Sequence, residues 1–122
     1  KGKPITVHAD GSQTRSFTWV EEAVEGIRLA GELDAGLDGS NLAGAAFNLG
    51  NTEEVSIAQL AELCLQITGS DSEIIYEEVG HPGDSRRRNP DISESLSALG
   101  WSAQQSLEEG LSSCWRWLQA EQ

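Results

Sequence analysis

The stretch Ala45–Tyr76, AAFNLGNTEEVSIAQLAELCLQITGSDSEIIY, holds the pattern that decides the fold. Its first residues, Ala45–Leu49, form an apolar run that predicts a mostly buried strand. A segment of helical length follows, and Glu73–Tyr76 then predicts a second strand. Strand, helix and strand in this order form a βαβ unit, which predicts parallel pairing of the two strands through a right-handed crossover.

Clear signals mark both ends of the helix in this stretch. Ser56 is the predicted N-cap, Gln59 completes a capping box, and Gly69 is the predicted C-terminal stop. Parallel sheets bind ligands beyond the carboxyl ends of their strands. Because these ends are predicted at Asn48–Asn51 and in the loop Gly80–Asp91, we expect a ligand site there.

The residues before this stretch predict two further short strands and one helix. Ile5–His8 is rich in β-branched residues and precedes a turn, and Phe17–Val20 is a second candidate strand. The helix has apolar residues at helical spacing and is expected to stop at Gly31, where a Gly-rich loop, 31–44, begins. Its apolar positions are Val20, Ala23, Val24, Ile27 and Ala30.

Two helices are predicted after the stretch. The first is the short segment Ser93–Leu99. The C-terminal helix, 106–120, opens at Ser106, and Glu109 completes a second capping box. Trp117 falls outside the apolar face of this helix, so we expect its ring to be partly exposed or to pack against something outside the chain.

The length and the charge of the chain limit the fold and the partners. At 122 residues the whole chain, 1–122, is expected to be a single α/β domain with a small sheet, a βαβ unit and about four helices. Its 20 acidic and 8 basic residues give a net charge of −12. Nucleic acids and anionic membranes are therefore not expected partners, because binding them needs a broad basic surface. No apolar run approaches the ~20 residues of a membrane span.

The cysteines and the first residues bear on the origin of the chain. Cys64 and Cys114 lie in predicted helices and lack the close spacing of a zinc site or a disulfide framework. We expect both to be buried, reduced thiols of a cytoplasmic protein. The chain contains no methionine and opens Lys1-Gly2-Lys3-Pro4, which predicts a piece of a longer protein.

The residues of a complete active site are not recognisable in the sequence. There is no glycine-rich dinucleotide turn and no P-loop. A tyrosine–lysine proton relay is also excluded, since Tyr76 is the one tyrosine and the lysines are Lys1 and Lys3. We therefore expect no catalytic residue, no metal site and no cofactor-binding residue in this chain.

Anion binding is the chemistry that the cations allow. Guanidinium groups bind phosphate through paired, charge-assisted hydrogen bonds, so the cluster Arg86–Arg88 is a candidate diphosphate site. The alternative is that the cluster offsets nearby carboxylates, such as Glu77, Glu78, Asp84 and Asp91. Arg15 is a second candidate, although its position before an apolar segment is also typical of a solvated edge residue.

Six segments, in order, resemble the extended short-chain dehydrogenase/reductase family. The segments are Pro4–Glu22, Phe47–Asn51, Pro82–Asp84, Arg88–Ile92, Leu99–Trp101 and Ser106–Leu111. The likeness is greatest to UDP-glucuronate decarboxylases and dTDP-glucose dehydratases. The resemblance implies the C-terminal, nucleotide-sugar-binding part of an NAD-dependent epimerase, dehydratase or decarboxylase, with NAD bound by an N-terminal Rossmann domain that this chain lacks.

The resemblance also implies roles for particular residues. Arg15 and Arg88 would bind the diphosphate of a UDP- or dTDP-sugar. Gln13 would lie beside the nucleotide, the backbone around Val7 would line the base pocket, and Asn48 would contact the nucleotide.

A function of a different class stays open at this point. The chain would then be a stand-alone, non-enzymatic remnant that docks to a partner or forms a homodimer. The exposed ring expected at Trp117 motivates this alternative.

Overall fold

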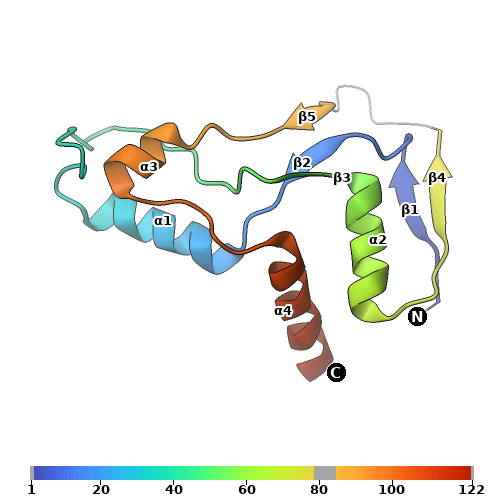
Figure 1. Cartoon of the computed structure of the whole chain (residues 1–122). Helices are drawn as coiled ribbons and strands as arrows, with labels where there is room; N and C mark the ends of the chain where they lie inside the picture. Colours follow the sequence, from blue (N-terminus) through green and yellow to red (C-terminus); the bar gives the residue numbers. More distant parts are fainter. Residues whose placement is uncertain (1, 79–84, 122) are drawn as a thin grey trace. The chain divides into compact units, whose positions relative to one another are not determined.

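The computed structural model describes residues 2–78 and 85–121, which form four helices and five short strands within those ranges (Figure 1). The elements are β1 (Ile5–His8), β2 (Thr14–Ser16), α1 (Val20–Glu32), β3 (Glu54–Ser56), α2 (Ile57–Thr68), β4 (Ile74–Glu77), β5 (Arg87–Arg88), α3 (Ser93–Leu99) and α4 (Leu107–Ala120). This composition confirms the predicted α/β class with four helices and small sheets.

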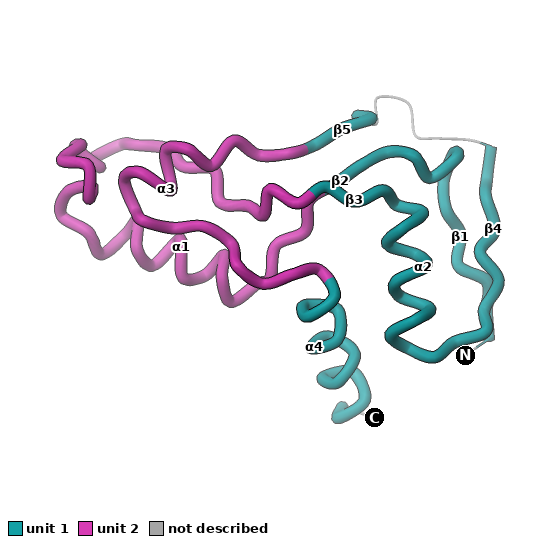
Figure 2. Tube along the Cα trace, viewed as in Figure 1, with its two compact units in different colours: residues 1–15, 54–88, 108–122 teal, residues 16–53, 89–107 magenta. Residues whose placement is uncertain are grey.

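The contacts within the chain divide it into two compact units (Figure 2). Unit 1 consists of Lys1–Arg15, Glu54–Arg88 and Glu108–Gln122. Unit 2 consists of Ser16–Glu53 and Asn89–Leu107. Because each unit is assembled from segments far apart in the sequence, the packing inside each is long-range.

Unit 1 is built on a parallel strand pair and the helix beside it. β1 pairs with β4, and Val7 lies opposite Tyr76. The Val7 side chain is 1% exposed, and α2, which packs against β1, contributes Ala61 to the same core. The Ala58 amide at the start of α2 donates to the Gly11 carbonyl at 3.0 Å, which ties the loop after β1 to the helix.

The predicted caps of α2 are confirmed. The Ser56 hydroxyl accepts from the Gln59 amide at 3.1 Å, and the Gln59 side chain accepts from the Ser56 amide at 2.9 Å. Gly69 ends the helix in the left-handed conformation with a φ of 63°. Both signals are local in the sequence, so tertiary context does not alter them.

Unit 2 packs α1 and α3 around Trp101. The indole is 4% exposed, and its Nε1 donates to the Glu22 carbonyl at 2.8 Å. The Glu22 side chain accepts from the amides of Gln104 and Gln105 at 2.6 and 3.0 Å, which holds the segment after α3 against α1. Trp101 and Glu22 together therefore organise this unit.

The predicted strand Ala45–Leu49 is wrong. This segment is irregular, and both Ala45 and Ala46 are exposed. The expected parallel pairing does exist, but β4 pairs with β1 and not with the residues before α2. An apolar run favours an extended backbone, whereas a strand also needs a partner, and these residues have none within the described part of the chain.

The second predicted strand is displaced along the chain. Residues 17–19 are irregular and Val20 opens α1, whereas the strand is β2, Thr14–Ser16. The reason is pairing, because β2 lies in the centre of a three-stranded sheet of order β3-β2-β5. α1 also continues through Gly31, the expected stop, as far as Glu32.

The apolar face predicted for α1 is largely open to solvent. Val20, Val24 and Ile27 are among its exposed residues, and the helix packs instead through Gly26 and its neighbours. The predicted loop from Gly80 is in part a strand, since Arg87 and Arg88 form β5. Residues 80–84 of that loop lie outside the described residues.

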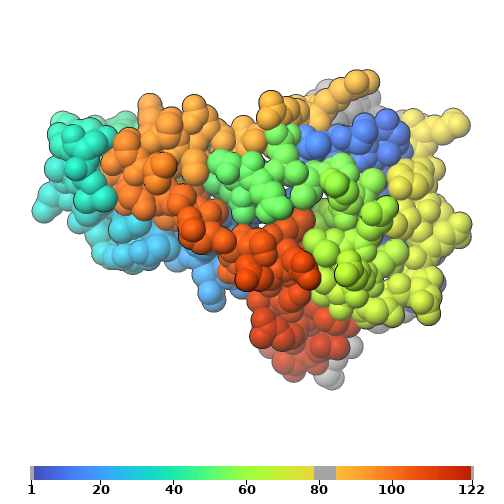
Figure 3. Space-filling view, viewed as in Figure 1, coloured from blue at the N-terminus to red at the C-terminus, as the bar shows by residue number. Residues whose placement is uncertain are grey.

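The C-terminal helix begins within one residue of its predicted start, and its surface is seen in red in Figure 3. Trp117 is 62% exposed, which confirms the expectation for this ring. The predicted burial of Cys114 is wrong, because α4 leaves this thiol exposed. Cys64 is half-buried, and burial raises the pKa of its thiol. Within residues 2–78 and 85–121, no helix has the length and apolar character needed to cross a bilayer.

Candidate anion-binding site

The pairing of β2 with β5 brings two of the predicted site residues together. The strands are parallel, and their register places Arg15 opposite Arg88 and Thr14 opposite Arg87. Paired residues project from the same face of a sheet and successive residues from opposite faces. One face of this strand pair therefore carries Arg15 and Arg88, and the other carries Thr14 and Arg87.

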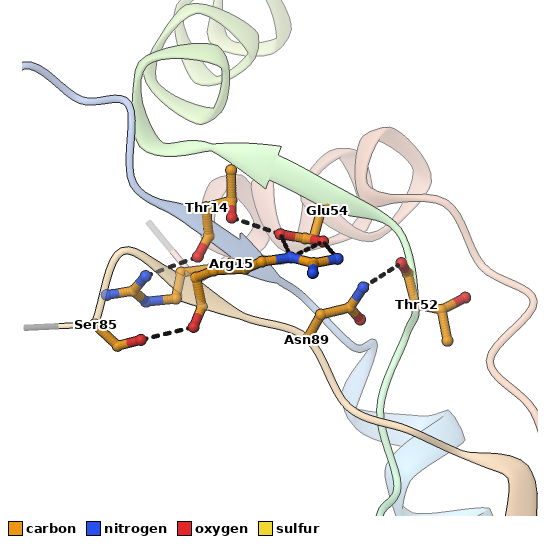
Figure 4. Close-up of polar contacts among 7 residues, drawn as sticks. Thr14, Arg15, Thr52, Glu54, Ser85 and Asn89 are labelled. Carbon is orange, nitrogen blue, oxygen red and sulfur yellow. Dashed lines mark hydrogen bonds and ion pairs between the residues drawn. The ribbon is translucent and has the colours of Figure 1, made fainter.

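Glu54 on β3 binds both residues of the second face (Figure 4). Its Oε1 accepts from the Thr14 hydroxyl at 2.6 Å. Its Oε2 accepts from Nε and Nη2 of Arg87 at 2.8 and 2.5 Å, which is a two-pronged ion pair. The Glu54 side chain is 21% exposed and that of Arg87 is 72% exposed. The carboxylate raises the pKa of Arg87 through these hydrogen bonds.

Within the arginine cluster, the structure assigns Arg87 to the ion-pair alternative. Arg87 forms an ion pair with Glu54, which is distant from it in the sequence. Arg88 is in register with Arg15. The Arg15 guanidinium donates from Nη1 to the Thr14 carbonyl at 2.7 Å, and its side chain is half-buried, so it is not the freely solvated edge residue of the alternative interpretation.

Gln13 and Val7 lie in the same unit as the two arginines. The Gln13 side chain donates to the His8 carbonyl at 3.1 Å, and the Gln13 carbonyl accepts from the Ile57 amide at 3.0 Å. These bonds hold the loop between β1 and β2 at the start of α2. The Val7 side chain is buried in the core and cannot contact a ligand. Any contact of Val7 with a ligand would therefore be through its backbone, which is the role that the resemblance implies.

The loop also contains a turn that is stabilised by a carboxylate. Asp10 Oδ1 accepts from the Ser12 hydroxyl at 2.6 Å and from the Ser12 amide at 3.0 Å. These hydrogen bonds lower the pKa of Asp10. The loop that leads from β1 to Arg15 is therefore ordered by its own side chains.

Asn48 belongs to unit 2, whereas the other four predicted site residues belong to unit 1. Its side-chain amide donates to the Asp91 carbonyl at 3.1 Å. In the same unit the Asn89 side-chain amide donates from Nδ2 to the Thr52 carbonyl at 3.3 Å (Figure 4). Both contacts link the segment before α3 to the segment before β3.

Glu54 and Thr14 lie beside the candidate site, on the other face of the strand pair, and were not predicted from the sequence. They are 40 residues apart, and Glu54 is 33 residues from Arg87. The one sequence signal for these contacts was the run of arginines at residues 86–88, which predicts a carboxylate partner but does not identify it. Within the described ranges, no group of three histidine, cysteine, aspartate or glutamate residues is arranged to hold a metal ion.

The relatives of the chain are nucleotide-sugar enzymes. UDP-glucuronic acid decarboxylase 1 of Xenopus tropicalis is 39% identical over 111 residues, which are 91% of this chain and 24% of that protein. UDP-glucuronic acid decarboxylase 3 of Arabidopsis thaliana is 38% identical over 112 residues, 91% of this chain and 30% of that protein. The chain thus spans less than a third of these relatives. No family model matches the sequence.

Solved structures of the same kind share the fold. UDP-glucuronic acid 4-epimerase from Bacillus cereus, in complex with UDP-glucuronic acid and NAD, has a TM-score of 0.86 and 27% identity, with 99% of this chain and 37% of that chain covered. UDP-glucose 4-epimerase from Thermotoga maritima, with UDP-glucose, has a TM-score of 0.83 and 29% identity, with 98% and 36% covered.

These matches confirm the resemblance: the chain is similar to nucleotide-sugar enzymes of the extended short-chain dehydrogenase/reductase family over part of their length. Within that family it is similar to UDP-glucuronic acid decarboxylases over part of their length. None of these proteins is an interaction module, so the matches lend no support to the alternative of a stand-alone docking domain.

Proposed function

We propose that this chain binds the diphosphate of a UDP- or dTDP-sugar between Arg15 and Arg88, as the nucleotide-sugar-binding part of an NAD-dependent enzyme. The observation that carries the proposal is the register of β2 and β5, which sets these two arginines opposite each other on one face. Like charges directly opposite each other on a sheet are unfavourable, and an anion between them removes that cost. Two guanidinium groups also match the oxygens of a diphosphate bidentately.

The charge of the chain supports a small ligand. With a net charge of −12, the chain repels extended polyanions and anionic membranes. A diphosphate needs only the local field of the two arginines. The thiols of Cys64 and Cys114, which form no disulfide, suit the reducing cytoplasm, where we place the protein.

The remaining site residues receive the roles that the family resemblance implies. Gln13 lies beside the nucleotide, the backbone around Val7 lines the pocket of the base, and Asn48 contacts the nucleotide. The Bacillus cereus epimerase is a complex with NAD. For the present protein we assign NAD to a Rossmann domain outside this chain, and substrate binding without a catalytic residue to the chain itself.

Calorimetric titration of the chain with UDP tests the proposal. Arg15→Ala is expected to weaken binding by about 10- to 100-fold, because each charge-assisted contact contributes about 1.5–3 kcal/mol. Arg88→Ala should have an effect of similar size. UMP should bind more weakly than UDP, since a single phosphate leaves one guanidinium without its ligand.

The matched control is Arg28→Ala. This substitution removes the same charge from α1, where Arg28 pairs with Glu25 and Glu32. Its affinity for UDP should equal that of the unsubstituted chain. Equal affinities for Arg15→Ala and Arg28→Ala, or the absence of UDP binding by the unsubstituted chain, would overturn the proposal.

A further inference from the structure

Glu54 connects all three strands of the sheet that carries the two arginines. It lies on β3, accepts from Thr14 on β2, and forms the two-pronged ion pair with Arg87 on β5. β2 is the central strand, so a single carboxylate spans the width of the sheet. Thr14 and Arg87 are opposite each other in the register, and Glu54 thus holds the two partners of one cross-strand pair.

β5 is a short strand that is open to solvent. It consists of two residues, both exposed, and its ladder to β2 includes the bond from the Thr14 amide to the Arg86 carbonyl at 2.9 Å. Short strand pairs are marginally stable in water. The charges add to the difficulty, because Arg86, Arg87 and Arg88 follow one another and Arg15 lies opposite Arg88.

The position of Glu54 offsets this repulsion without occupying the anion site. Alternation along the strands places Glu54 with Thr14 and Arg87, on the face opposite to that of Arg15 and Arg88. Its carboxylate is 21% exposed, so its ion pair is less screened by solvent than a fully exposed pair. The negative charge therefore stabilises the position of β5 from the face opposite to that of Arg15 and Arg88.

We propose that Glu54 is a positioning residue for nucleotide-diphosphate binding: by holding Thr14 and Arg87 it keeps β5 in register with β2, so that Arg88 stands opposite Arg15 before the ligand arrives. This inference rests on the function proposed above. When the binding-competent conformation of a site is populated for only a fraction of the time, the apparent affinity for the ligand falls in proportion to that fraction. Loss of the Glu54 contacts is therefore expected to weaken UDP binding by about ten-fold, on the scale of a lost charge-assisted contact.

The sign of this effect separates positioning from plain electrostatics. Glu54→Gln removes a negative charge from the neighbourhood of an anion site. If Glu54 acted only through its charge, the substitution would strengthen UDP binding. A positioning role predicts the opposite, because the glutamine loses the ion pair with Arg87.

The experiment measures UDP affinity and strand pairing in the same variants. Glu54→Gln and Arg87→Gln should each weaken UDP binding by about ten-fold, and the double variant should be no weaker than the single ones, because both substitutions break one contact. Hydrogen exchange of the Thr14 amide, which donates to Arg86 across the two strands, should accelerate in each variant. Glu54→Asp keeps the charge and should retain part of the affinity.

Glu25→Gln is the matched control. It makes the same change of charge in the exposed ion pair with Arg28 on α1, and it should leave both UDP affinity and Thr14 exchange unchanged. The Arg87 side chain is 72% exposed, so Arg87→Gln should not disturb folding. It therefore tests the same ion pair if the Glu54 variant fails to fold. Unchanged or tighter UDP binding by Glu54→Gln and Arg87→Gln would overturn the inference and leave the proposed function standing.

The two proposals fail in different ways. If the unsubstituted chain does not bind UDP, the proposed function falls, and the role of Glu54 in ligand binding falls with it. Thr14 exchange then still decides whether Glu54 holds β5. If the unsubstituted chain binds UDP and Arg15→Ala abolishes that binding, the proposed function stands. If Thr14 exchange in Glu54→Gln then equals that in the unsubstituted chain, the positioning role of Glu54 is refuted.

Discussion

Replacement of Gly11 by alanine should destabilise unit 1 through two separate effects. Gly11 has a φ of +69°, a conformation that costs a residue with a Cβ about 1–2 kcal/mol. A Cβ at this position would also lie 2.9 Å from Val7 Cγ1 and 3.1 Å from Ala58 Cβ. Val7 is 1% exposed and cannot move away, so overpacking adds about 1–3 kcal/mol. The expected loss of unfolding free energy is about 2–5 kcal/mol.

Gly69→Ala isolates the packing part of this loss. Gly69 has a φ of +63° in the same unit, but among the described residues no atom beyond its immediate chain neighbours lies within 4 Å of the position that its Cβ would take. Its replacement should therefore cost only the backbone part, about 1–2 kcal/mol. Urea unfolding, monitored by the helical circular dichroism signal at about 222 nm, gives the free energy of unfolding of both variants for comparison. Equal losses would show that Gly11 is not packed against Val7 and Ala58, and the reasoning for this part of unit 1 would be refuted.

Two further predictions concern titration and reactivity. Ser12→Ala should raise the pKa of Asp10, measured by NMR titration of its carboxyl carbon, because the Ser12 hydroxyl is the largest cause of the lowered value. Since the pKa of Asp10 is lowered in the folded state, its stabilising contribution is complete above about pH 4 and is lost as the pH falls through the lowered value. A thiol reagent such as DTNB should modify Cys114, which is exposed, before Cys64, whose burial raises the thiol pKa. The reverse order would contradict the described burial of these helices.

The helix ends are the part of the fold that the sequence predicts best. The capping box of Ser56 and Gln59 and the left-handed stop at Gly69 are present as expected. α3 likewise ends at Gly100, with a φ of 65°. In each case the partners are within a few residues of one another, so the local chain determines the geometry without help from the rest of the molecule.

The candidate site was predicted in part. Family resemblance singled out Arg15 and Arg88, and the β2–β5 register now sets them opposite each other. Composition alone did not distinguish Arg88 from Arg87, because neighbouring arginines differ only in the face of the strand that each occupies. The ion pair between Arg87 and Glu54 was missed since nothing near either residue in the sequence identifies the other.

The sequence by itself therefore determined the approximate positions of the helices, the caps of α2, the glycine stop of α3, the acidic character of the chain and the positions of its cations. The strands at Ile5–His8 and Glu73–Tyr76 were also predicted, but the tertiary structure alone decided the remaining strands. The apolar run at Ala45–Leu49 remains irregular, whereas the polar triplet Thr14–Ser16 is the central strand of a sheet. The physical reason is that a helix satisfies its backbone hydrogen bonds within one segment, and a strand satisfies them only through a partner that the fold brings to it.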